Sequence, residues 1–224
     1  MMIRLRTAGS VRPFLAAVAA SFVLLSALAM ADQAQTSKGS EPAWQPLFDG
    51  KTLTNWQSTT FAGAGAVRVE NGQIILEAGA DLTGINWIGP DLPTTNYEIA
   101  LHAMRLEGSD FFAGVTFPVA NSFCSLILGG WGGTVVGLSS INTLDASENQ
   151  TSQSADFESN RWYAVRIRVT PAKIEVWLDE RQIIDQDLKD NKVDTRMEVD
   201  PSRPLGVASW QTKSALRDLR LRRL

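Results

Sequence analysis

Apolar and polar residues alternate with a period of two along much of this chain, and this alternation constrains the fold more than any other feature. The clearest example is the stretch WYAVRIRVT, in which one parity holds Tyr163, Val165, Ile167 and Val169 and the other holds Trp162, Arg166 and Arg168. Successive side chains of a β-strand point to opposite faces of its sheet. The pattern therefore predicts a strand with one buried face.

Other segments show the same period. In NYEIALHAM, one parity holds Tyr97, Ile99, Leu101 and Ala103, and the other holds Glu98, Ala100, His102 and Met104. The segment KIEVWLDERQIID predicts a hairpin that turns at Asp179 and Glu180. No stretch of a dozen residues keeps a helical stripe, and turn signals recur at short intervals. The sequence thus predicts an all-β fold, a sandwich of two antiparallel sheets.

Four arginines occupy outward positions of the expected strands. Two lie on the polar parity of WYAVRIRVT, and two alternate with Leu219 and Leu221 in the closing segment ALRDLRLRRL. These arginines are Arg166, Arg168, Arg220 and Arg222. We expect them to form a solvated sheet face that discourages pairing at the sheet edge, and we assign no site role to them.

The N-terminal segment has the order of a secretory signal peptide. Three arginines precede a continuous apolar run, and Ala29 and Ala31 supply the small residues of a cleavage site. An uncleaved membrane anchor is the alternative. We therefore expect a signal peptide over residues 1–31, a polar linker over 32–42 and one domain over 43–224, in a periplasmic or secreted protein.

Charge and cysteine content exclude several partners. Loss of residues 1–31 removes three arginines and no acid, which changes the formal net charge from −3 to −6. Nucleic acid and anionic lipid surfaces would repel such a domain, so we expect neither as a partner. Cys124 is the single cysteine, so no intramolecular disulfide can form, and its neighbours in SFCSLIL indicate a small buried hydrophobe.

The glycine-rich stretch GGWGGTVVGLSS, residues 129–140, does not fit a phosphate-binding loop. Leu138 stands where a P-loop needs lysine, and Val135 stands where a dinucleotide fingerprint needs its third glycine. Trp131 is then either an aromatic platform displayed for a ligand or the tip of a hairpin that folds back onto the sheet. Its glycine neighbours would let a ligand approach without Cβ atoms in the way.

The order of the segments resembles the bacterial 3-keto-disaccharide hydrolase family. The resemblance rests on WQPLFDGKTLTNW, NYEIALHAMRLEGSDFFAG, RWYAVRIRVTPAKIEVWLDERQI and RPLGVASWQTKSALRDLRLRRL, and it covers Trp44 to Leu224. It implies a concanavalin A-like (laminin-G-like) jelly-roll sandwich. It also implies an exported protein that acts on glycosides whose C3 hydroxyl is already a ketone.

The chain departs from the family pattern after the central strand. Many members carry a segment like NSG[IV]FFR there, followed by one like YEVQI, whereas this chain reads GSDFFAGVTFPVANSFCSLILGGWGG. We therefore carry no catalytic residue over from the family.

Candidate catalytic residues follow from the chemistry instead. A C3 ketone acidifies the hydrogen at C2, so cleavage needs a base near C2, a cation or strong donor near the C3 oxygen and a proton source for the leaving group. We expect Arg105 to stabilise the enolate, Glu148 or His102 to act as the base, and Asp110 to orient the substrate or act as a second acid. For each of them, an exposed strand or turn position without a role is the alternative.

A sugar site also needs an aromatic platform. We expect substrate contacts from Trp87, Trp131, Trp210 and Asn149, because each lies beside small or polar residues. Trp44 and Trp56 are expected in the core, whereas Trp162 and Trp177 line a sheet face or lie under a loop.

Two functional classes remain open. One is a 3-keto-glycoside hydrolase or lyase that abstracts the C2 proton, eliminates the aglycone and hydrates the product; the other is a lectin-like carbohydrate-binding protein. An endoglucanase is disfavoured, because no strand carries an ExDxxE-type carboxylate pattern. The expected chemistry calls for no cofactor. A metal remains open, since Asp110, Asp145 and Glu148 could supply oxygen ligands.

Overall fold

The fold is taken from a computed structural model of the chain, which describes residues 42–224. The expected signal peptide, and the expected linker up to Glu41, lie outside the described residues. Within the described part, no helix has the length and apolar character needed to cross a membrane.

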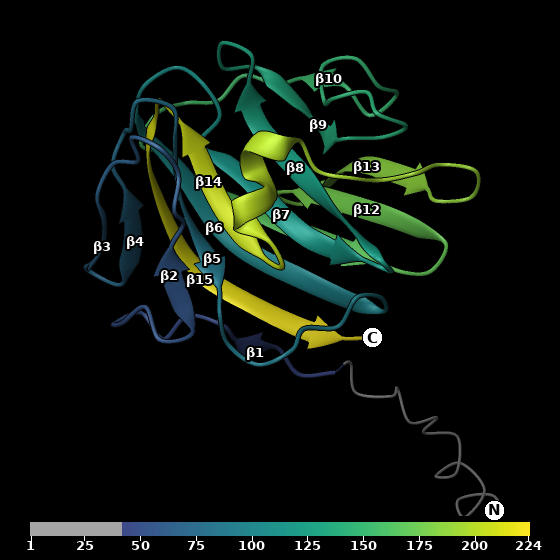
Figure 1. Ribbon diagram of the computed structural model, residues 1–224, viewed down its shortest axis with the longest axis horizontal. Helices are drawn as coiled ribbons and strands as arrows, with labels where there is room; N and C mark the ends of the chain where they lie inside the picture. Colours follow the sequence, from purple (N-terminus) through teal and green to yellow (C-terminus); the bar gives the residue numbers. More distant parts are fainter. Residues whose placement is uncertain (1–41) are drawn as a thin grey trace, which may run out of the picture. The chain divides into compact units, whose positions relative to one another are not determined.

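Two antiparallel sheets stack face to face (Figure 1). The first has eight strands in the order β13-β12-β11-β6-β15-β4-β3, and β1 also pairs with β15. Its strands are β1 (Gln45–Pro46), β3 (Val67–Glu70), β4 (Gln73–Leu76), β6 (Tyr97–Glu107), β11 (Tyr163–Val169), β12 (Lys173–Leu178), β13 (Arg181–Asp187) and β15 (Lys213–Arg223).

The second sheet has seven strands in the order β10-β9-β8-β7-β14-β5-β2. These are β2 (Trp56–Ser58), β5 (Leu82–Trp87), β7 (Ala113–Val119), β8 (Ser122–Gly130), β9 (Val135–Ser139), β10 (Gln153–Ser154) and β14 (Gly206–Trp210). A 3₁₀ helix, η1 (Met197–Ser202), lies in front of this sheet in Figure 1.

The core between the sheets is built from the apolar parity of the strands. Tyr163, Val165, Ile167 and Val169 are all buried, while the residues between them are partly exposed. Cys124 is fully buried among these apolar side chains, and burial raises the pKa of its thiol to about 12. The sandwich predicted from alternation, and the concanavalin A-like jelly roll implied by the family resemblance, are both confirmed.

The two sheets differ in how their outer faces are covered. Strands β5 and β7 are buried along their whole length, on both faces. Their outer face carries small residues, because Gly84 pairs with Ala208, and Ala208 in turn pairs with Gly114. With so little side-chain volume on the sheet, η1 and the segment around Ala146 can approach it closely: a Cβ at Gly137 would lie 2.7 Å from the Ala146 carbonyl oxygen. This covering leaves one part of the face open, which holds the candidate site.

Candidate functional site

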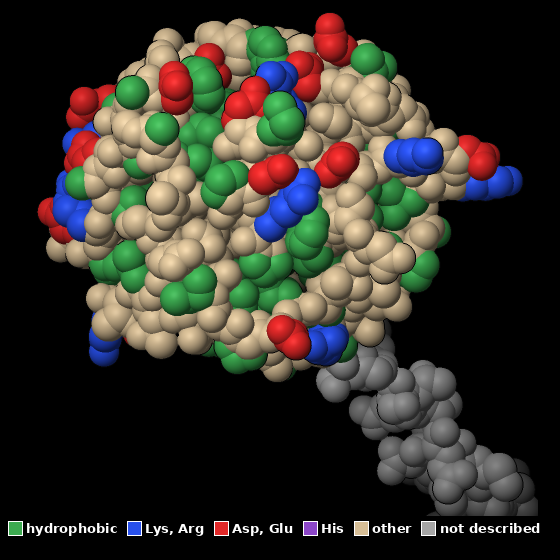
Figure 2. Space-filling model, in the orientation of Figure 1, with side chains coloured by type: hydrophobic (Ala, Val, Ile, Leu, Met, Phe, Trp, Pro, Cys, Tyr) green, Lys and Arg blue, Asp and Glu red, His purple; other side chains and the backbone are tan. Residues whose placement is uncertain are grey.

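A pocket of about 250 Å³ opens on the outer face of the seven-stranded sheet. Its floor comes from the strands, and its sides come from the glycine-rich stretch and from the segment that enters η1. The lining residues are Leu82, Asp110, Phe111, Ser125, Ile127, Trp131, Ser139, Arg196, Glu198, Val199 and Trp210. Figure 2 shows this side of the molecule, with acidic, basic and hydrophobic side chains close together near its centre.

Apolar side chains form one half of the pocket. Leu82 and Trp210 are direct partners across β5 and β14. The Phe111 ring lies 6.4 Å from the Trp210 ring, centroid to centroid, at 40°. It can lie there because Gly114 has no side chain: a Cβ at that position would be 3.1 Å from Phe111 and 3.5 Å from Ile127. The glycine thus brings a phenyl ring and an isoleucine together over the sheet.

Hydroxyl groups line the floor of the other half. Ser125 pairs with Ser139 across β8 and β9, and its hydroxyl lies 2.8 Å from that of Thr116. The Ser139 side chain is buried, and its hydroxyl has no hydrogen-bond partner within the described residues. A buried hydroxyl that faces a pocket without a partner is a group that a ligand can satisfy.

Three charged side chains meet beside these serines. The segment before η1 runs alongside Ser140, because the amide of each of Ser140 and Asp194 donates to the carbonyl oxygen of the other. This contact brings Arg196 to the polar half. Its Nη1 lies 2.9 Å from Asp145 Oδ2, and its Nη2 lies 2.8 Å from Glu198 Oε1. The hydrogen bond from Arg196 lowers the pKa of Glu198, and the same bond raises the pKa of Arg196.

Asp110 fixes the glycine-rich stretch at the rim. Its Oδ1 accepts a hydrogen bond from the Phe111 amide at 2.7 Å, and its Oδ2 accepts one from the Gly132 amide at 3.0 Å. Trp131, with a positive φ of 49°, is 44% exposed. Trp131 is therefore displayed at the pocket rather than folded into the core.

Arg105 lies between the sheets and does not line the pocket. It is 6% exposed, its Nη2 donates to the Gly133 carbonyl oxygen at 3.1 Å, and its guanidinium lies 5.3 Å from the Phe112 ring centroid. Gly129 has a φ of +77°, which favours glycine, and a Cβ there would lie 2.5 Å from this Nη2. Burial lowers the pKa of Arg105, against the opposing effects of Tyr163 and Asp110. Arg105 thus supports the glycine-rich stretch from beneath.

The two expected bases lie apart from each other. His102 is on the eight-stranded sheet, where its Nδ1 is 3.0 Å from Asp218 Oδ2, and no histidine shows on the side drawn in Figure 2. Glu148 is exposed in the segment between β9 and β10, next to Asn149. Neither side chain lines the pocket.

Two expected substrate contacts also lie elsewhere. Trp87 is 6% exposed, packs edge-on against Trp56 at 5.2 Å and donates from Nε1 to the Pro90 carbonyl oxygen. The Asn149 side chain forms its hydrogen bonds within the protein. Its Nδ2 donates to three carbonyl oxygens, and its Oδ1 accepts from Thr151. Of the expected site residues, the structure brings together Asp110, Trp131 and Trp210.

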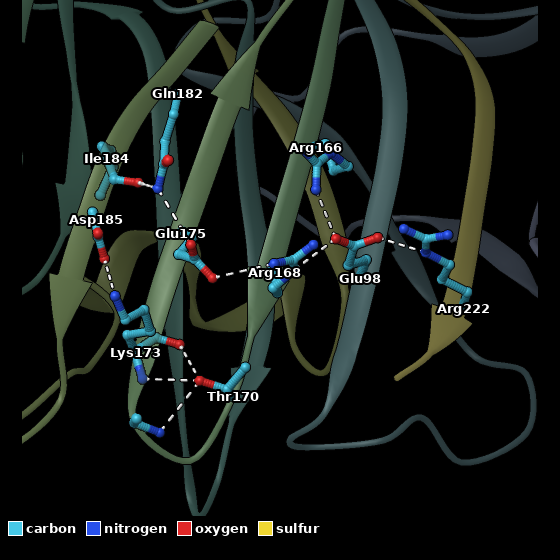
Figure 3. Close-up of polar contacts among 11 residues, drawn as sticks. Glu98, Arg166, Arg168, Thr170, Lys173, Glu175, Gln182, Ile184, Asp185 and Arg222 are labelled. Atoms are coloured by element: carbon cyan, nitrogen blue, oxygen red, sulfur yellow. Dashed lines mark hydrogen bonds and ion pairs between the residues drawn. The ribbon is translucent and has the colours of Figure 1, made fainter. Parts of the chain in front are cut away.

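The arginines of the eight-stranded sheet correct the expectation of a solvated face. Figure 3 shows Glu98, which is fully buried, between arginines from two neighbouring strands. Its carboxylate accepts hydrogen bonds from Arg166 Nη1 at 2.7 Å, Arg168 Nε at 2.8 Å and Arg222 Nε at 2.6 Å. Arg166 and Arg168 also stack on Trp177, whereas Arg220 remains exposed. Three of the four arginines thus pair with a buried acid, although Arg166 and Arg168 remain partly exposed.

A second hollow, of about 580 Å³, lies at the edge of the sandwich near β10 and the β12–β13 turn. Two of its charged groups are engaged with each other, because Arg161 Nη2 lies 2.8 Å from Asp179 Oδ2. Its one aromatic side chain, Tyr163, is buried. Without a displayed ring it offers a sugar less than the first pocket does.

The sequence reasoning missed Phe111, Ser139, Arg196 and Glu198. A local signal existed for Phe111, which directly follows Asp110. For Arg196 and Glu198 the signal was weak, since TRMEVDPSRP reads as an ordinary charged loop. Across residues 42–224, no three His, Cys, Asp or Glu side chains are grouped so that they could hold a metal ion.

The sequence and the fold of the chain are similar to those of known proteins. A family model described as a 3-keto-alpha-glucoside-1,2-lyase-like domain matches residues 83–222. No curated protein sequence matches the chain. Similar solved structures include Crh5 transglycosylase, with a TM-score of 0.55 and 12% identity over 82% of this chain and 85% of that one.

Two further structures are similar. A provisionally assigned glycosyl hydrolase from Parabacteroides distasonis ATCC 8503 has a TM-score of 0.52 and 13% identity, over 81% of this chain and 94% of that one. A provisionally assigned β-glucanase from Mycobacterium abscessus has a TM-score of 0.51 and 11% identity, over 80% and 98%. At these identities the likeness shows the fold alone.

Proposed function

The chain belongs to the 3-keto-alpha-glucoside-1,2-lyase-like domain family, and from this premise we propose that it cleaves the glycosidic bond of 3-keto-glycosides in the pocket beside η1. One observation carries the proposal. The range matched by the family model, residues 83–222, contains every residue that lines the pocket except Leu82. The pocket thus lies almost wholly within the part of the chain that the family model matches.

The reaction is a proton abstraction followed by elimination. A base removes the hydrogen at C2, the electron pair forms an enolate with the C3 carbonyl, and the enolate then expels the aglycone oxygen from C1. The aglycone takes up a proton, which leaves an unsaturated ketone, and addition of water to this product completes a net hydrolysis. The steps need a base, a stabiliser of negative charge at O3 and a proton donor.

Glu198 and Arg196 supply the first two groups. The Glu198 carboxylate, whose pKa the hydrogen bond from Arg196 lowers, is ionised at neutral pH, so it can accept the C2 proton. Arg196 has five N–H donors. One from each of its three nitrogens faces Glu198 or Asp145. The remaining two are available for the C3 oxygen, where the enolate charge develops.

Asp110 is a positioning residue in this scheme, because its Oδ2 holds the Gly132 amide of the glycine-rich stretch while its Oδ1 accepts from the neighbouring Phe111 amide. Trp131 and Trp210 provide apolar ring faces for the C–H side of a sugar. The Ser139 hydroxyl lies at the floor, where it can bond a sugar hydroxyl.

The test is turnover on matched substrates. The purified domain is incubated with a panel of 3-keto-glycosides and with their unoxidised parents, and free sugar products are measured by chromatography. Release of 3-keto-glucose or its unsaturated derivative from the oxidised set alone supports the proposal. Binding of the same sugars without any turnover would contradict it and favour a lectin-like carbohydrate-binding protein.

A further inference from the structure

The pocket divides into two halves with different chemistry. Strand register places Leu82, Trp210 and Ile127 on one side, with Phe111 lying over Gly114 between them. Ser125 and Ser139 lie one row of residues further along β8 and β9, next to the segment that carries Arg196 and Glu198. The apolar and polar groups are therefore separated along the strand direction.

The apolar half suits a group without hydroxyls. Aromatic rings can pack against the C–H face of a sugar, but the aliphatic side chains of Leu82 and Ile127 offer no hydrogen bond to a sugar edge. A sugar hydroxyl buried there without a partner would lose its hydrogen bonds to water without compensation. An apolar group in the same place gains free energy in proportion to the apolar surface that it buries.

The volume of the pocket also favours a compact apolar group over a second sugar ring. The cavity volume is about 250 Å³, which is below the range of about 300–1,000 Å³ typical of pockets that enclose a drug-sized ligand. One sugar ring and one compact substituent can share such a space. A second sugar ring, with its hydroxyls, would lie either against the apolar half or outside the pocket.

We propose that the substrates are 3-keto-glycosides with an apolar, aryl or alkyl aglycone, rather than 3-keto-disaccharides. This inference rests on the proposed function for its chemistry, and on the division of the pocket for its specificity. The sugar occupies the polar half, where Arg196, Glu198 and Ser139 reach its oxygens. The aglycone lies over Phe111, Ile127 and Trp210, and it leaves from there as an alcohol or phenol.

Binding of unreactive probes tests the specificity without turnover. Phenyl glucosides of both anomers, the matching methyl glucosides and common glucose disaccharides are titrated into the purified domain, with tryptophan fluorescence as the readout. We expect the better phenyl glucoside to bind at least about tenfold more tightly than the methyl glucosides and the disaccharides. Equal or tighter binding of a disaccharide, or no binding of either phenyl glucoside, overturns the inference.

Variants locate the aglycone. Ile127→Thr, in the apolar half, should lower phenyl glucoside affinity by about tenfold and leave methyl glucoside affinity within about twofold. Leu82→Thr serves as a second variant with the same expectation. Ile88→Thr is the matched control, because Ile88 is 57% exposed and does not line the pocket. Equal effects on both glucosides would contradict the placement.

Kinetics separate the two proposals. Phenyl and disaccharide 3-keto substrates are compared by kcat/KM on the same protein. Absence of turnover together with a retained preference for phenyl probes contradicts the proposed function and leaves the aglycone assignment in place. Turnover with higher kcat/KM on disaccharides supports the proposed function and contradicts the aglycone assignment.

Discussion

At the scale of single residues, the pocket depends on how Arg196 is shared between two carboxylates. The guanidinium contacts Asp145 on the segment after β9 and Glu198 in η1. It therefore links the two segments that lie over the outer face of the seven-stranded sheet. The hydrogen bond from Arg196 also lowers the pKa of Glu198. Arg196 thus affects the charge state of Glu198, holds it in position and links the two segments that lie over the sheet.

Glu198→Gln tests the base. The amide cannot accept the C2 proton, so we expect kcat/KM on the best 3-keto-glycoside to fall about 10²–10⁴-fold. His102→Gln is the control, because His102 lies on the other sheet, and it should stay within about threefold. A parallel series at Asp110, Arg105 and Glu148, each first shown to be folded, separates this assignment from the one reached by sequence reasoning. If Glu148→Gln is the damaging change instead, the base is misassigned.

The pH dependence follows from the pKa shift of Glu198. Its pKa is lowered from 4.5 by the hydrogen bond from Arg196, so the ionised form persists below that pH. We expect kcat/KM to hold level as the pH falls through 4.5 and to decline only below it, as the carboxylate takes up its proton. Steady-state kinetics across the acid range checks this. A decline centred near pH 6 would point to a histidine base.

Trp131 offers a test of display against burial. It is 44% exposed, so Trp131→Ala should change the free energy of unfolding by less than about 1 kcal/mol while weakening glycoside binding. Trp56→Ala is the contrasting variant, because Trp56 is 3% exposed in the core and its truncation should cost about 3–5 kcal/mol. Denaturant unfolding and ligand titration of both variants give the comparison. Similar destabilisation by both would contradict a displayed ring.

At the scale of elements, the register between β6, β11 and β15 buries Glu98. Arg168 and Arg222 are its direct partners on the two neighbouring strands, and Arg166 is one step further along its face. Burial raises the pKa of Glu98, but the hydrogen bonds from Arg222, Arg168 and Arg166 outweigh it, so the pKa is lowered overall. The centre of the eight-stranded sheet thus contains one buried glutamate that is hydrogen-bonded to three arginines.

Glu98→Gln should therefore destabilise the protein at neutral pH. Removing one member of a buried ion pair leaves the other charges uncompensated, and we expect a loss of about 3 kcal/mol. Because the folded pKa lies below the unfolded one, Glu98 stabilises the fold above the unfolded pKa, and this contribution disappears as the pH falls through the folded pKa. Unfolding free energies should converge for the two proteins in acid. If the difference between the two unfolding free energies stays constant across the pH range, the contribution of the Glu98–arginine network is contradicted.

At the scale of the whole molecule, the N-terminal segment makes a separate prediction. We expect export with cleavage after Ala31, because the apolar run ends in small residues and a polar stretch follows. Mass spectrometry of the protein from its native host should give a chain that begins near Asp32 outside the cytoplasm. An intact Met1 on a cytoplasmic species would contradict this.

The sequence alone determined which face of each alternating strand is buried between the sheets. Period-two alternation is a local property, because each strand directs its own residues in and out, so the core residues of β11 and the buried Cys124 could be predicted without any knowledge of pairing. The family resemblance added the jelly-roll topology. Trp131 and Trp210 could be expected near a ligand from their small neighbours.

Only the tertiary structure decided which polar residues meet. Arg196 reaches Asp145 across 51 positions of sequence, and Arg222 reaches Glu98 across 124. Such contacts depend on strand order, register and loop paths, which no local pattern encodes. The same holds for Trp87, whose small and polar neighbours in sequence gave no sign that its ring packs against Trp56. The pocket exists because glycines and alanines from separate strands align across one sheet face, and their alignment is a property of the sheet rather than of any strand in it.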